Sequence, residues 1–162
     1  MTIRLARTSD AADIAAIWNP IIRDTLITFT TKEKTAPLLS AHISERQGAF
    51  WVAEEAGKVL GFVTYGPFRT GPGYAATVEH TVILSPQARG RGLGRSLMEK
   101  AMKQAASQGL HVMVGGVSAA NPEGLAFHEA LGFSQTGRLP QVGRKNGQWL
   151  DLIFVQKTLG SP

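Results

Sequence analysis

Hydrophobic residues follow two different periods along the first fifty positions. They alternate with polar residues over 2–6 and then recur every three or four residues from Ile14 to Ile22, which predicts a short strand and a helix opened by Ser9-Asp10. Pro20 lies inside the helical pattern, so it is expected to kink or split the helix. A polar stretch then leads to a second helix predicted over 38–47.

After this helix, hydrophobic and polar residues alternate again, as they do in strands. Strands are predicted over 50–54 and 59–65 as a hairpin with a turn at 55–58, and a loop over 68–74 that is rich in Gly and Pro separates them from a strand over 76–84. One face of that last strand carries Glu79, Thr81 and Ile83, and the other carries Val78, His80, Val82 and Leu84.

The second half of the chain alternates helices and strands. The expected elements are a helix over 93–108 stopped by Gly109, a strand over 111–117, a helix from Asn121-Pro122 to 131–132, and strands over 134–142 and 149–157 around a turn at 144–147. Because helices return between the strands, we expect an α/β (α+β) architecture in one domain over 1–162. Its centre is a mixed, mostly antiparallel sheet with helices on both faces.

Composition narrows the class of protein. Of the 162 residues 43% are hydrophobic and none is cysteine, which excludes a disulfide scaffold, a thiolate metal site and a Cys nucleophile. The net charge of +5 favours an anionic partner, such as a polyphosphate cofactor, nucleic acid or acidic lipid. No stretch is long and apolar enough for a membrane span, and the N-terminus lacks a signal-peptide layout, so a cytoplasmic protein is expected.

A glycine cluster gives the strongest chemical signal. Gly90, Gly92 and Gly94 lie between the strand that ends at Leu84 and the helix predicted from residue 93. Glycines at such a place expose backbone N–H groups to an anion, and the helix N-terminus adds about half a positive charge, so a diphosphate fits. The spacing matches neither a dinucleotide fingerprint, whose last glycine is missing, nor a Walker loop, whose lysine is missing.

The cluster forms the pattern Arg89-x-x-Gly92-x-Gly94, which resembles the pyrophosphate loop for acetyl-CoA in the GNAT superfamily of N-acetyltransferases. The segment with Asn121 and Phe127-His128-Glu129-Ala130-Leu131-Gly132-Phe133 resembles the C-terminal cofactor motif of the superfamily, and the N-terminal segment resembles its first strand and helix. The likeness covers nearly the whole chain and implies a GNAT-like acyl-CoA N-acyltransferase fold.

A narrower resemblance concerns the phosphinothricin and methionine sulfoximine acetyltransferase family, which acetylates the α-amino group of small amino acids. The similar motifs are Thr77-Val78-Glu79-His80-Thr81-Val82, the segment 128–133, and Gly143-Arg144-Lys145-Asn146-Gly147-Gln148-Trp149-Leu150-Asp151. The resemblance implies acetyl-CoA as co-substrate, a small-molecule amine or amino-acid acceptor, direct attack in a ternary complex, a homodimer, and antibiotic or herbicide resistance. The cofactor-binding residues that it implies are Val82, Ile83, Leu84, Arg89, Gly90, Arg91, Gly92, Leu93, Gly94, Arg95 and Asn121.

Glu79 is the first catalytic candidate. It interrupts an apolar strand, where desolvation is expected to raise the pKa of its carboxyl group toward a value useful for a general base. The resemblance places the base, which also contacts the substrate, at this position. The alternative is a buried Glu that forms a structural ion pair with an Arg.

His128 is the second catalytic candidate. The resemblance places it where many GNAT proteins have a Tyr proposed to protonate the leaving thiolate, and an imidazole can relay a proton in either direction. The alternative is a histidine on the helix surface in contact with water. His80 points away from Glu79 and is interpreted as a packing residue.

The remaining candidates concern the substrate and the pantetheine arm. Arg69 is expected to clamp a substrate carboxylate, with Tyr74 lining the same pocket, unless Arg69 is simply solvated. Asn121 caps a helix and, by resemblance, also lies near pantetheine, while Gly124 departs from the serine that the family commonly has. Two further interpretations are packing for Trp149 and a turn for Lys145.

Other functions stay open. The acceptor can instead be a protein N-terminus, a lysine or a polyamine, although cationic acceptors favour an acidic cleft. A CoA-binding regulator without catalysis and a basic nucleic-acid-binding domain are alternatives from other classes. No nucleic acid is expected as partner, because the basic residues are scattered apart from 89–95; no membrane partner is expected either. No His, Asp and Glu spacing predicts a metal site.

Overall fold

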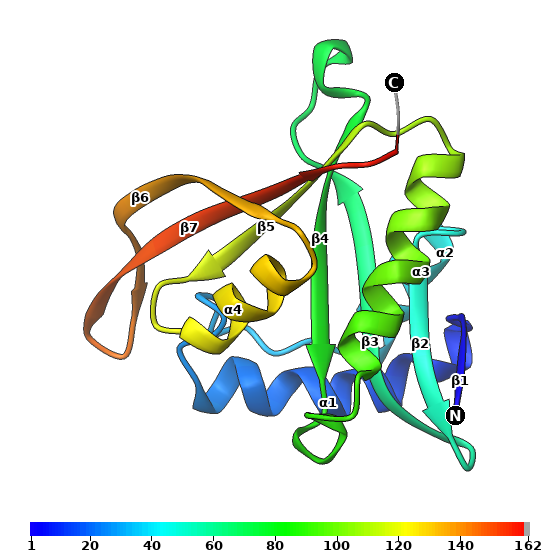
Figure 1. Cartoon of the computed structure of the whole chain (residues 1–162). Helices are drawn as coiled ribbons and strands as arrows, with labels where there is room; N and C mark the ends of the chain where they lie inside the picture. Colours follow the sequence, from blue (N-terminus) through cyan, green and yellow to red (C-terminus); the bar gives the residue numbers. More distant parts are fainter. Residues whose placement is uncertain (161–162) are drawn as a thin grey trace.

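A seven-stranded sheet with the order β1-β2-β3-β4-β5-β7-β6 forms the centre of the computed structural model, which describes residues 1–160 (Figure 1). The strands are β1 (Thr2–Leu5), β2 (Phe50–Glu55), β3 (Lys58–Pro67), β4 (Thr77–Leu84), β5 (Val112–Ser118), β6 (Ser134–Lys145) and β7 (Gln148–Thr158). All neighbouring strands are antiparallel except β4 and β5, which are parallel. The expected mixed, mostly antiparallel sheet is confirmed.

Helices cover both faces of this sheet. They are α1 (Ala11–Asp24), α2 (Ala36–Glu45), α3 (Leu93–Ser107) and α4 (Pro122–Ala130). In Figure 1, α3 and α4 lie in front of the sheet and α1 and α2 behind it. Leu97, Met98 and Ala101 of α3 belong to one hydrophobic core, and Ile14 of α1 and Leu39 of α2 belong to a second core on the other face. No helix of residues 1–160 is both long and apolar enough to cross a bilayer.

Two expectations about the helices need correction. Pro20 does not split α1, which is a single helix from Ala11 to Asp24; buried Ile14 and Ile21 anchor it on both sides of the proline, and this packing outweighs the missing backbone hydrogen bond. The second helix begins at Ala36 rather than 38, because the side chain of Thr35 caps it by accepting a hydrogen bond from the backbone N–H of Leu38.

The last hairpin also differs from its prediction. Its turn is only Asn146-Gly147, both with positive φ, the pairing that a two-residue hairpin turn requires. Lys145 is therefore the last residue of β6, not a turn residue; it is buried, and its Nζ donates to the carbonyl of Thr28 at 2.7 Å. Trp149 is 59% exposed and stacks under the guanidinium of Arg144, so its interpretation as a packing residue was wrong.

Strands β4 and β5 pair over a short distance and then separate. Only Thr77, Val78 and Glu79 have partners on β5, although β4 continues to Leu84. Figure 1 shows the two strands diverging toward their C-terminal ends, with α4 lying in front of the opening. Backbone groups and side chains at the ends of both strands are thereby left facing the gap, and the cavities described below lie there.

Candidate active site

The loop between β4 and α3 takes its shape from glycine. Gly90 and Gly92 have φ values of +74° and +76°, a region that residues with a Cβ rarely adopt, and no atom lies within 4 Å of the position where a Cβ would stand. Gly92 is the N-cap of α3. Gly90 and Gly92 themselves therefore add no side chain before the first N–H groups of α3, which favours an anion site at this helix N-terminus.

Gly94 serves a different purpose. A Cβ at this position would lie 3.0 Å from the ring of Phe127 and 3.3 Å from Leu84. The glycine therefore allows α3 to approach α4 and the end of β4 closely. The result is a groove with apolar side chains in its lining and the N-terminus of α3 at one edge.

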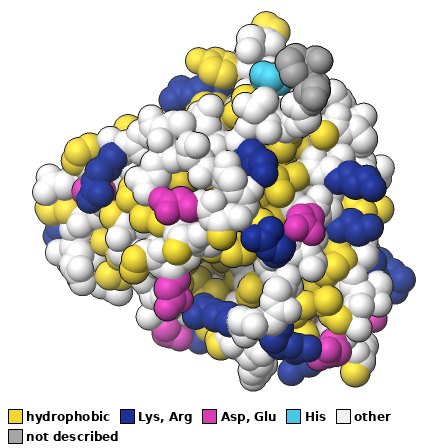
Figure 2. Space-filling model, in the orientation of Figure 1, with side chains coloured by type: hydrophobic (Ala, Val, Ile, Leu, Met, Phe, Trp, Pro, Cys, Tyr) yellow, Lys and Arg dark blue, Asp and Glu magenta, His cyan; other side chains and the backbone are white. Residues whose placement is uncertain are grey.

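This groove, here called the α3 groove, consists of two adjoining hollows of about 280 and 260 Å³. It contains every residue expected to bind the cofactor except Arg91: Val82, Ile83, Leu84, Arg89, Gly90, Gly92, Leu93, Gly94, Arg95 and Asn121. Figure 2 shows the face with this groove, hollowed below α4, with basic side chains spread among acidic and apolar ones. Arg91 points elsewhere, because its guanidinium pairs with the carboxylate of Glu55 at 2.6 Å.

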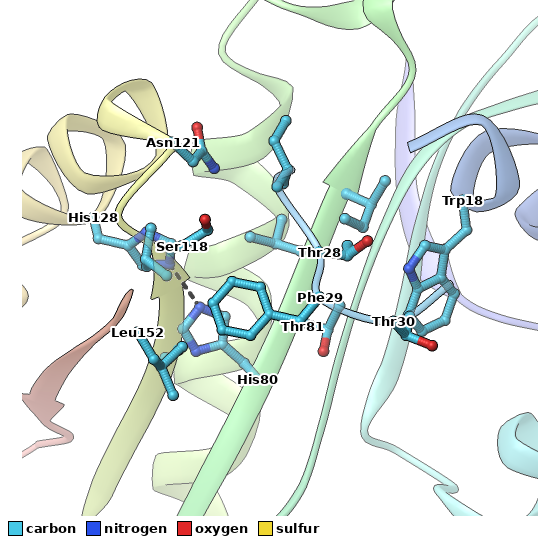
Figure 3. A pocket seen from close by; sticks show the side chains of 16 residues that line it. Trp18, Thr28, Phe29, Thr30, His80, Thr81, Ser118, Asn121, His128 and Leu152 are labelled. Atoms are coloured by element: carbon cyan, nitrogen blue, oxygen red, sulfur yellow. Dashed lines mark hydrogen bonds between the residues drawn. The ribbon is translucent and has the colours of Figure 1, made fainter. Parts of the chain in front are cut away.

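A second cavity of about 300 Å³, here called the inner cavity, lies at the gap between β4 and β5 (Figure 3). Its lining comes from α1, from the segment 27–30, and from β4, β5, α4 and β7. It shares Ile27, Val82, Ile83, Asn121 and His128 with the α3 groove, so the two spaces meet at these residues. Apart from its two histidines, no residue of the lining is ionisable.

Asn121 lies at the junction and holds a structural role as well. Its Oδ1 accepts a hydrogen bond from the backbone N–H of Gly124 at 3.0 Å, which caps α4 as expected. The amide folds so closely over Gly124 that a Cβ there would lie 2.3 Å from Nδ2 of Asn121. A side chain at position 124 would therefore force the Asn121 amide to move.

His128 does not lie on the helix surface. It is 6% exposed, and its Nδ1 lies 2.7 Å from the carbonyl oxygen of Gly124. Its Nε2 lies 2.8 Å from Nε2 of His80, whose own Nδ1 lies 2.9 Å from the carbonyl oxygen of Val114. This contact is the dashed line in Figure 3. The solvated alternative for His128 is thereby excluded.

Burial and hydrogen bonding act in opposite directions on the ionisation of both rings. Burial lowers the pKa of His128, against the hydrogen bond to Gly124, which raises it. The pKa of His80 falls to about 3, because of burial and of the charge on a protonated His128. The two rings are therefore not both positively charged at neutral pH.

Glu79 lies on the opposite face of β4 from His80, next to Gly116. Its Oε2 lies 3.3 Å from the position of a Cβ at Gly116, a residue of the inner-cavity lining, but Glu79 itself is not in that lining. Within residues 1–160 its carboxylate forms no ion pair, so the alternative of a structural pair with an Arg finds no support. Burial raises the pKa of the Glu79 carboxyl, the expected direction.

Arg69 and Tyr74 lie elsewhere. Both line a separate cavity near Arg46 and Gln108 that has no residue in common with the inner cavity. The guanidinium of Arg69 stacks over the ring of Phe68. Arg69 and Tyr74 thus line the same cavity, as expected, but it is not the cavity that His80 and His128 line.

Sequence reasoning missed the part of His80 in this site. The alternation along β4 correctly places it opposite to Glu79, and its burial agrees with packing, but the ring also lines the inner cavity and contacts His128. The signal lay in Gly115 on the neighbouring strand: a Cβ there would lie 2.7 Å from Cε1 of His80. Only knowledge of the pairing between β4 and β5 connects these two residues.

The glycine loop at a helix N-terminus, the opened pair of parallel strands and the second cavity behind them agree with the acyl-CoA N-acyltransferase fold that the sequence resemblance implies. Residues 15–133 match the model of the acetyltransferase (GNAT) family, and the chain belongs to this family. It is an N-acetyltransferase whose co-substrate is acetyl-CoA.

Individual relatives cover nearly the whole chain. It is 40% identical to the L-amino acid N-acyltransferase MnaT of Escherichia coli, over 98% of this chain and 94% of the relative. It is 38% identical to the L-methionine sulfoximine/L-methionine sulfone acetyltransferase of Salmonella typhimurium, over 98% and 95%. The crystal structure of a phosphinothricin acetyltransferase from Sinorhizobium meliloti with acetyl-CoA superposes with a TM-score of 0.92 at 31% identity, covering 98% of this chain and 88% of the other. The resemblance found in the sequence is confirmed.

Proposed function

We propose that this enzyme acetylates the α-amino group of a small amino-acid-like molecule of the methionine sulfoximine, methionine sulfone or phosphinothricin type. The observation that carries the proposal is the inner cavity, which has about 300 Å³ and meets the α3 groove at His128 and Asn121. Pockets of this size accommodate a small molecule rather than a folded segment of a protein. The relatives named above act on acceptors of this kind.

The proposed geometry places the two substrates on opposite sides of the gap. The diphosphate of acetyl-CoA binds at the N-terminus of α3, where Gly90 and Gly92 leave the N–H groups open, and the pantetheine arm follows the α3 groove toward Asn121. The acceptor occupies the inner cavity between Trp18 and the histidine pair (Figure 3). Amine and thioester then meet where the two spaces join, which supplies the proximity that direct transfer needs.

The proposed reaction is a single displacement. Glu79, whose carboxylate lies against Gly116 of the cavity lining, takes one proton from the ammonium group of the acceptor through a water molecule, and burial raises its pKa in the direction that a general base needs. The amine nitrogen attacks the thioester carbon, a C–N bond forms, and the C–S bond breaks with its electron pair on sulfur. The thiolate takes the second proton that the nitrogen loses, and Glu79 returns the first to solvent. His128, at the junction, stabilises the charge that develops on the leaving sulfur.

The proposal also includes the oligomeric state, the cellular location and a resistance phenotype. A homodimer is supported by the exposed apolar side chains that the β6–β7 hairpin presents, among them Val142 and Trp149. A cytoplasmic location is supported by the absence of cysteine from the sequence, which suits a reducing compartment without requiring it. Acetylation of a toxic amino-acid analogue would confer resistance to it.

The test is an acceptor panel with purified protein and acetyl-CoA. Release of CoA thiol is followed with a colorimetric reagent in the presence of methionine sulfoximine, methionine sulfone, phosphinothricin, a polyamine or a basic peptide, and the protein contributes no thiol of its own. We expect turnover with the small amino acids only. Turnover confined to the peptide or the polyamine would refute the acceptor class and retain the transferase. Binding of acetyl-CoA without turnover of any acceptor would favour a regulator.

A further inference from the structure

The four ring nitrogens of His80 and His128 are all engaged with other atoms. Each Nδ1 faces a backbone carbonyl oxygen, that of Val114 at 2.9 Å for His80 and that of Gly124 at 2.7 Å for His128. The two Nε2 atoms face each other at 2.8 Å. Because a carbonyl oxygen only accepts hydrogen bonds, both Nδ1 atoms must carry a proton to make these contacts.

A proton count follows from this geometry. A neutral imidazole has one N–H, and in each ring it is already used at Nδ1. Two neutral rings would therefore turn two lone pairs toward each other at 2.8 Å, a distance typical of a hydrogen bond between them. The contact becomes a hydrogen bond only when one further proton lies between the Nε2 atoms, which gives the pair a single positive charge.

We propose that His80 and His128 hold one shared proton between their Nε2 atoms, and that His80 is a positioning residue of acetyl transfer which keeps His128 charged and fixed at the junction of the α3 groove and the inner cavity. The role in transfer rests on the proposed function. The shared proton itself does not, because it follows from the hydrogen-bonding partners of the two rings.

Two phenylalanine rings and a glycine surround the two histidine rings. Phe133 contacts both rings, and Phe127 stands edge-on to His128 at 5.2 Å between centroids. Gly115 lies directly against His80, where a Cβ would be 2.7 Å from the ring. A side chain at position 115 would push His80 away from His128. The lack of a side chain at position 115 therefore allows His80 to stay in contact with His128.

No other charge within residues 1–160 neutralises the pair. Strand β5 carries no ionisable side chain, and neither ring forms a salt bridge or a hydrogen bond with a charged residue. The ionisable groups on the other elements packed around the rings are Glu79 on the far face of β4, Glu123 and Glu129 on α4, and Asp151 and Lys157 on β7. Burial opposes the shared proton by lowering the pKa of His128, and the two carbonyl contacts together with the Nε2 acceptor of His80 oppose burial. A second positive charge on the pair forms only in strong acid, because burial and the charge of His128 lower the pKa of His80 to about 3.

The consequence for the reaction is electrostatic. With all its nitrogens engaged, His128 has none free to exchange a proton with the substrates, so it acts through its charge. A fixed positive charge in a partly desolvated site stabilises the oxyanion and the thiolate that develop beside it. The charge also disfavours an ammonium group in the inner cavity and favours the neutral amine that attacks.

The proton count is tested by nitrogen-15 NMR of the wild-type protein, labelled at histidine. The chain has four histidines, and the variants His42→Gln and His111→Gln assign the two that lie outside the pair. At pH 7 we expect protonated Nδ1 in both rings of the pair and a single Nε2 proton that correlates with both Nε2 atoms. Two neutral rings at pH 7, one of them with a bare Nδ1, would overturn the proposal, whether or not the protein acetylates any acceptor of the panel.

The role in transfer is tested with His80→Gln, because glutamine can still hydrogen-bond to His128 but cannot share its proton as an imidazole does. With an accepted amino acid we expect kcat to fall roughly 10- to 100-fold, as on removal of a stabilising group from an active site, and KM for acetyl-CoA to change less than threefold. The alkaline limb of the kcat profile, on which the pair loses its proton as pH rises, should move to lower pH. His111→Gln, an exposed control, should behave as wild type. If His80→Gln has wild-type kcat and an alkaline limb at the wild-type pH, His80 has only a structural role and the proposal is wrong.

Discussion

The α3 groove and the inner cavity meet at His128 and Asn121, yet they are built in different ways. The groove comes mainly from two continuous stretches of chain, one from the end of β4 through the glycine loop to the first turn of α3 and one along α4, and the first stretch offers a ligand largely backbone N–H groups. The inner cavity is assembled from segments distant in sequence, and it offers side chains. A cofactor shared by a whole family suits the first kind of construction, and an acceptor that differs between members suits the second.

The sharpest way to test this division is Glu79→Gln, which should affect the chemical step and leave the groove intact. Removing the proposed base is expected to lower kcat by about 10²- to 10³-fold, within the range for general-base catalysis, with little change in binding of acetyl-CoA. Since burial raises the pKa of Glu79, the acid limb of the wild-type kcat profile should lie above the ordinary pKa of a glutamate, and activity should be lost as pH falls through it. Steady-state kinetics against pH measure both effects.

Glu129→Gln is the matched control, because that carboxylate is exposed on α4 and bonds only to Gln135 among the described residues. It should retain wild-type kcat. A Glu79→Gln enzyme with more than about a third of wild-type kcat would remove Glu79 from the mechanism, since a general base contributes at least about 10²-fold.

The next largest effect is expected from Gly92→Val, which should act on the groove alone. A side chain at φ +76° costs roughly 1–2 kcal/mol and stands in front of the N-terminus of α3, so we expect KM for acetyl-CoA to rise at least tenfold and the melting temperature to fall. Gly57→Val is the control for strain: its φ is +78°, and it lies in the β2–β3 turn, away from the groove. If both variants weaken acetyl-CoA equally, the loss is one of stability and not of diphosphate binding.

A smaller effect should follow from Gly124→Ser, at the boundary of the two spaces. The new Cβ would displace the amide of Asn121, which lies 2.3 Å from that position, and so disturb both the helix cap and the pantetheine end of the groove. We expect a three- to tenfold rise in KM for acetyl-CoA and a loss of about 1 kcal/mol of stability. Asn121→Ala, which removes the amide altogether, should match it; an unchanged KM in both would show that the amide is not used by the cofactor.

The smallest effect is predicted for Arg69→Ala. Because Arg69 lies at a separate cavity, KM for the amino-acid acceptor should change less than threefold. Kinetics with methionine sulfone and with methyl-ester analogues would measure it. A tenfold rise confined to acceptors with a free carboxylate would restore the carboxylate clamp expected from the sequence, and with it a contribution from this loop to the inner cavity.

The same division explains what the sequence could predict. The glycine loop is local, so the spacing of Gly90, Gly92 and Gly94 was enough to predict an open loop at the N-terminus of a helix. Strands and helices were placed within a few residues for the same reason. The direction of Arg91 could not be predicted, because its partner Glu55 is distant in the chain. The contact between His80 and His128 spans 48 positions and depends on how β4, β5 and α4 pack, and the burial of Lys145 depends on Thr28. No periodic pattern records either contact.

The separation of β4 from β5 has a last consequence, for the divergence of this enzyme. The segment 27–30, Trp18 and Leu152 shape the inner cavity, and apart from Ile27 they have no part in the α3 groove. With the acceptor in the inner cavity, as proposed above, substitutions there would change which amine is accepted and leave the binding of acetyl-CoA unaltered. A gene duplicate under selection for a different acceptor would therefore need to alter only the inner cavity, and it would keep the α3 groove unchanged.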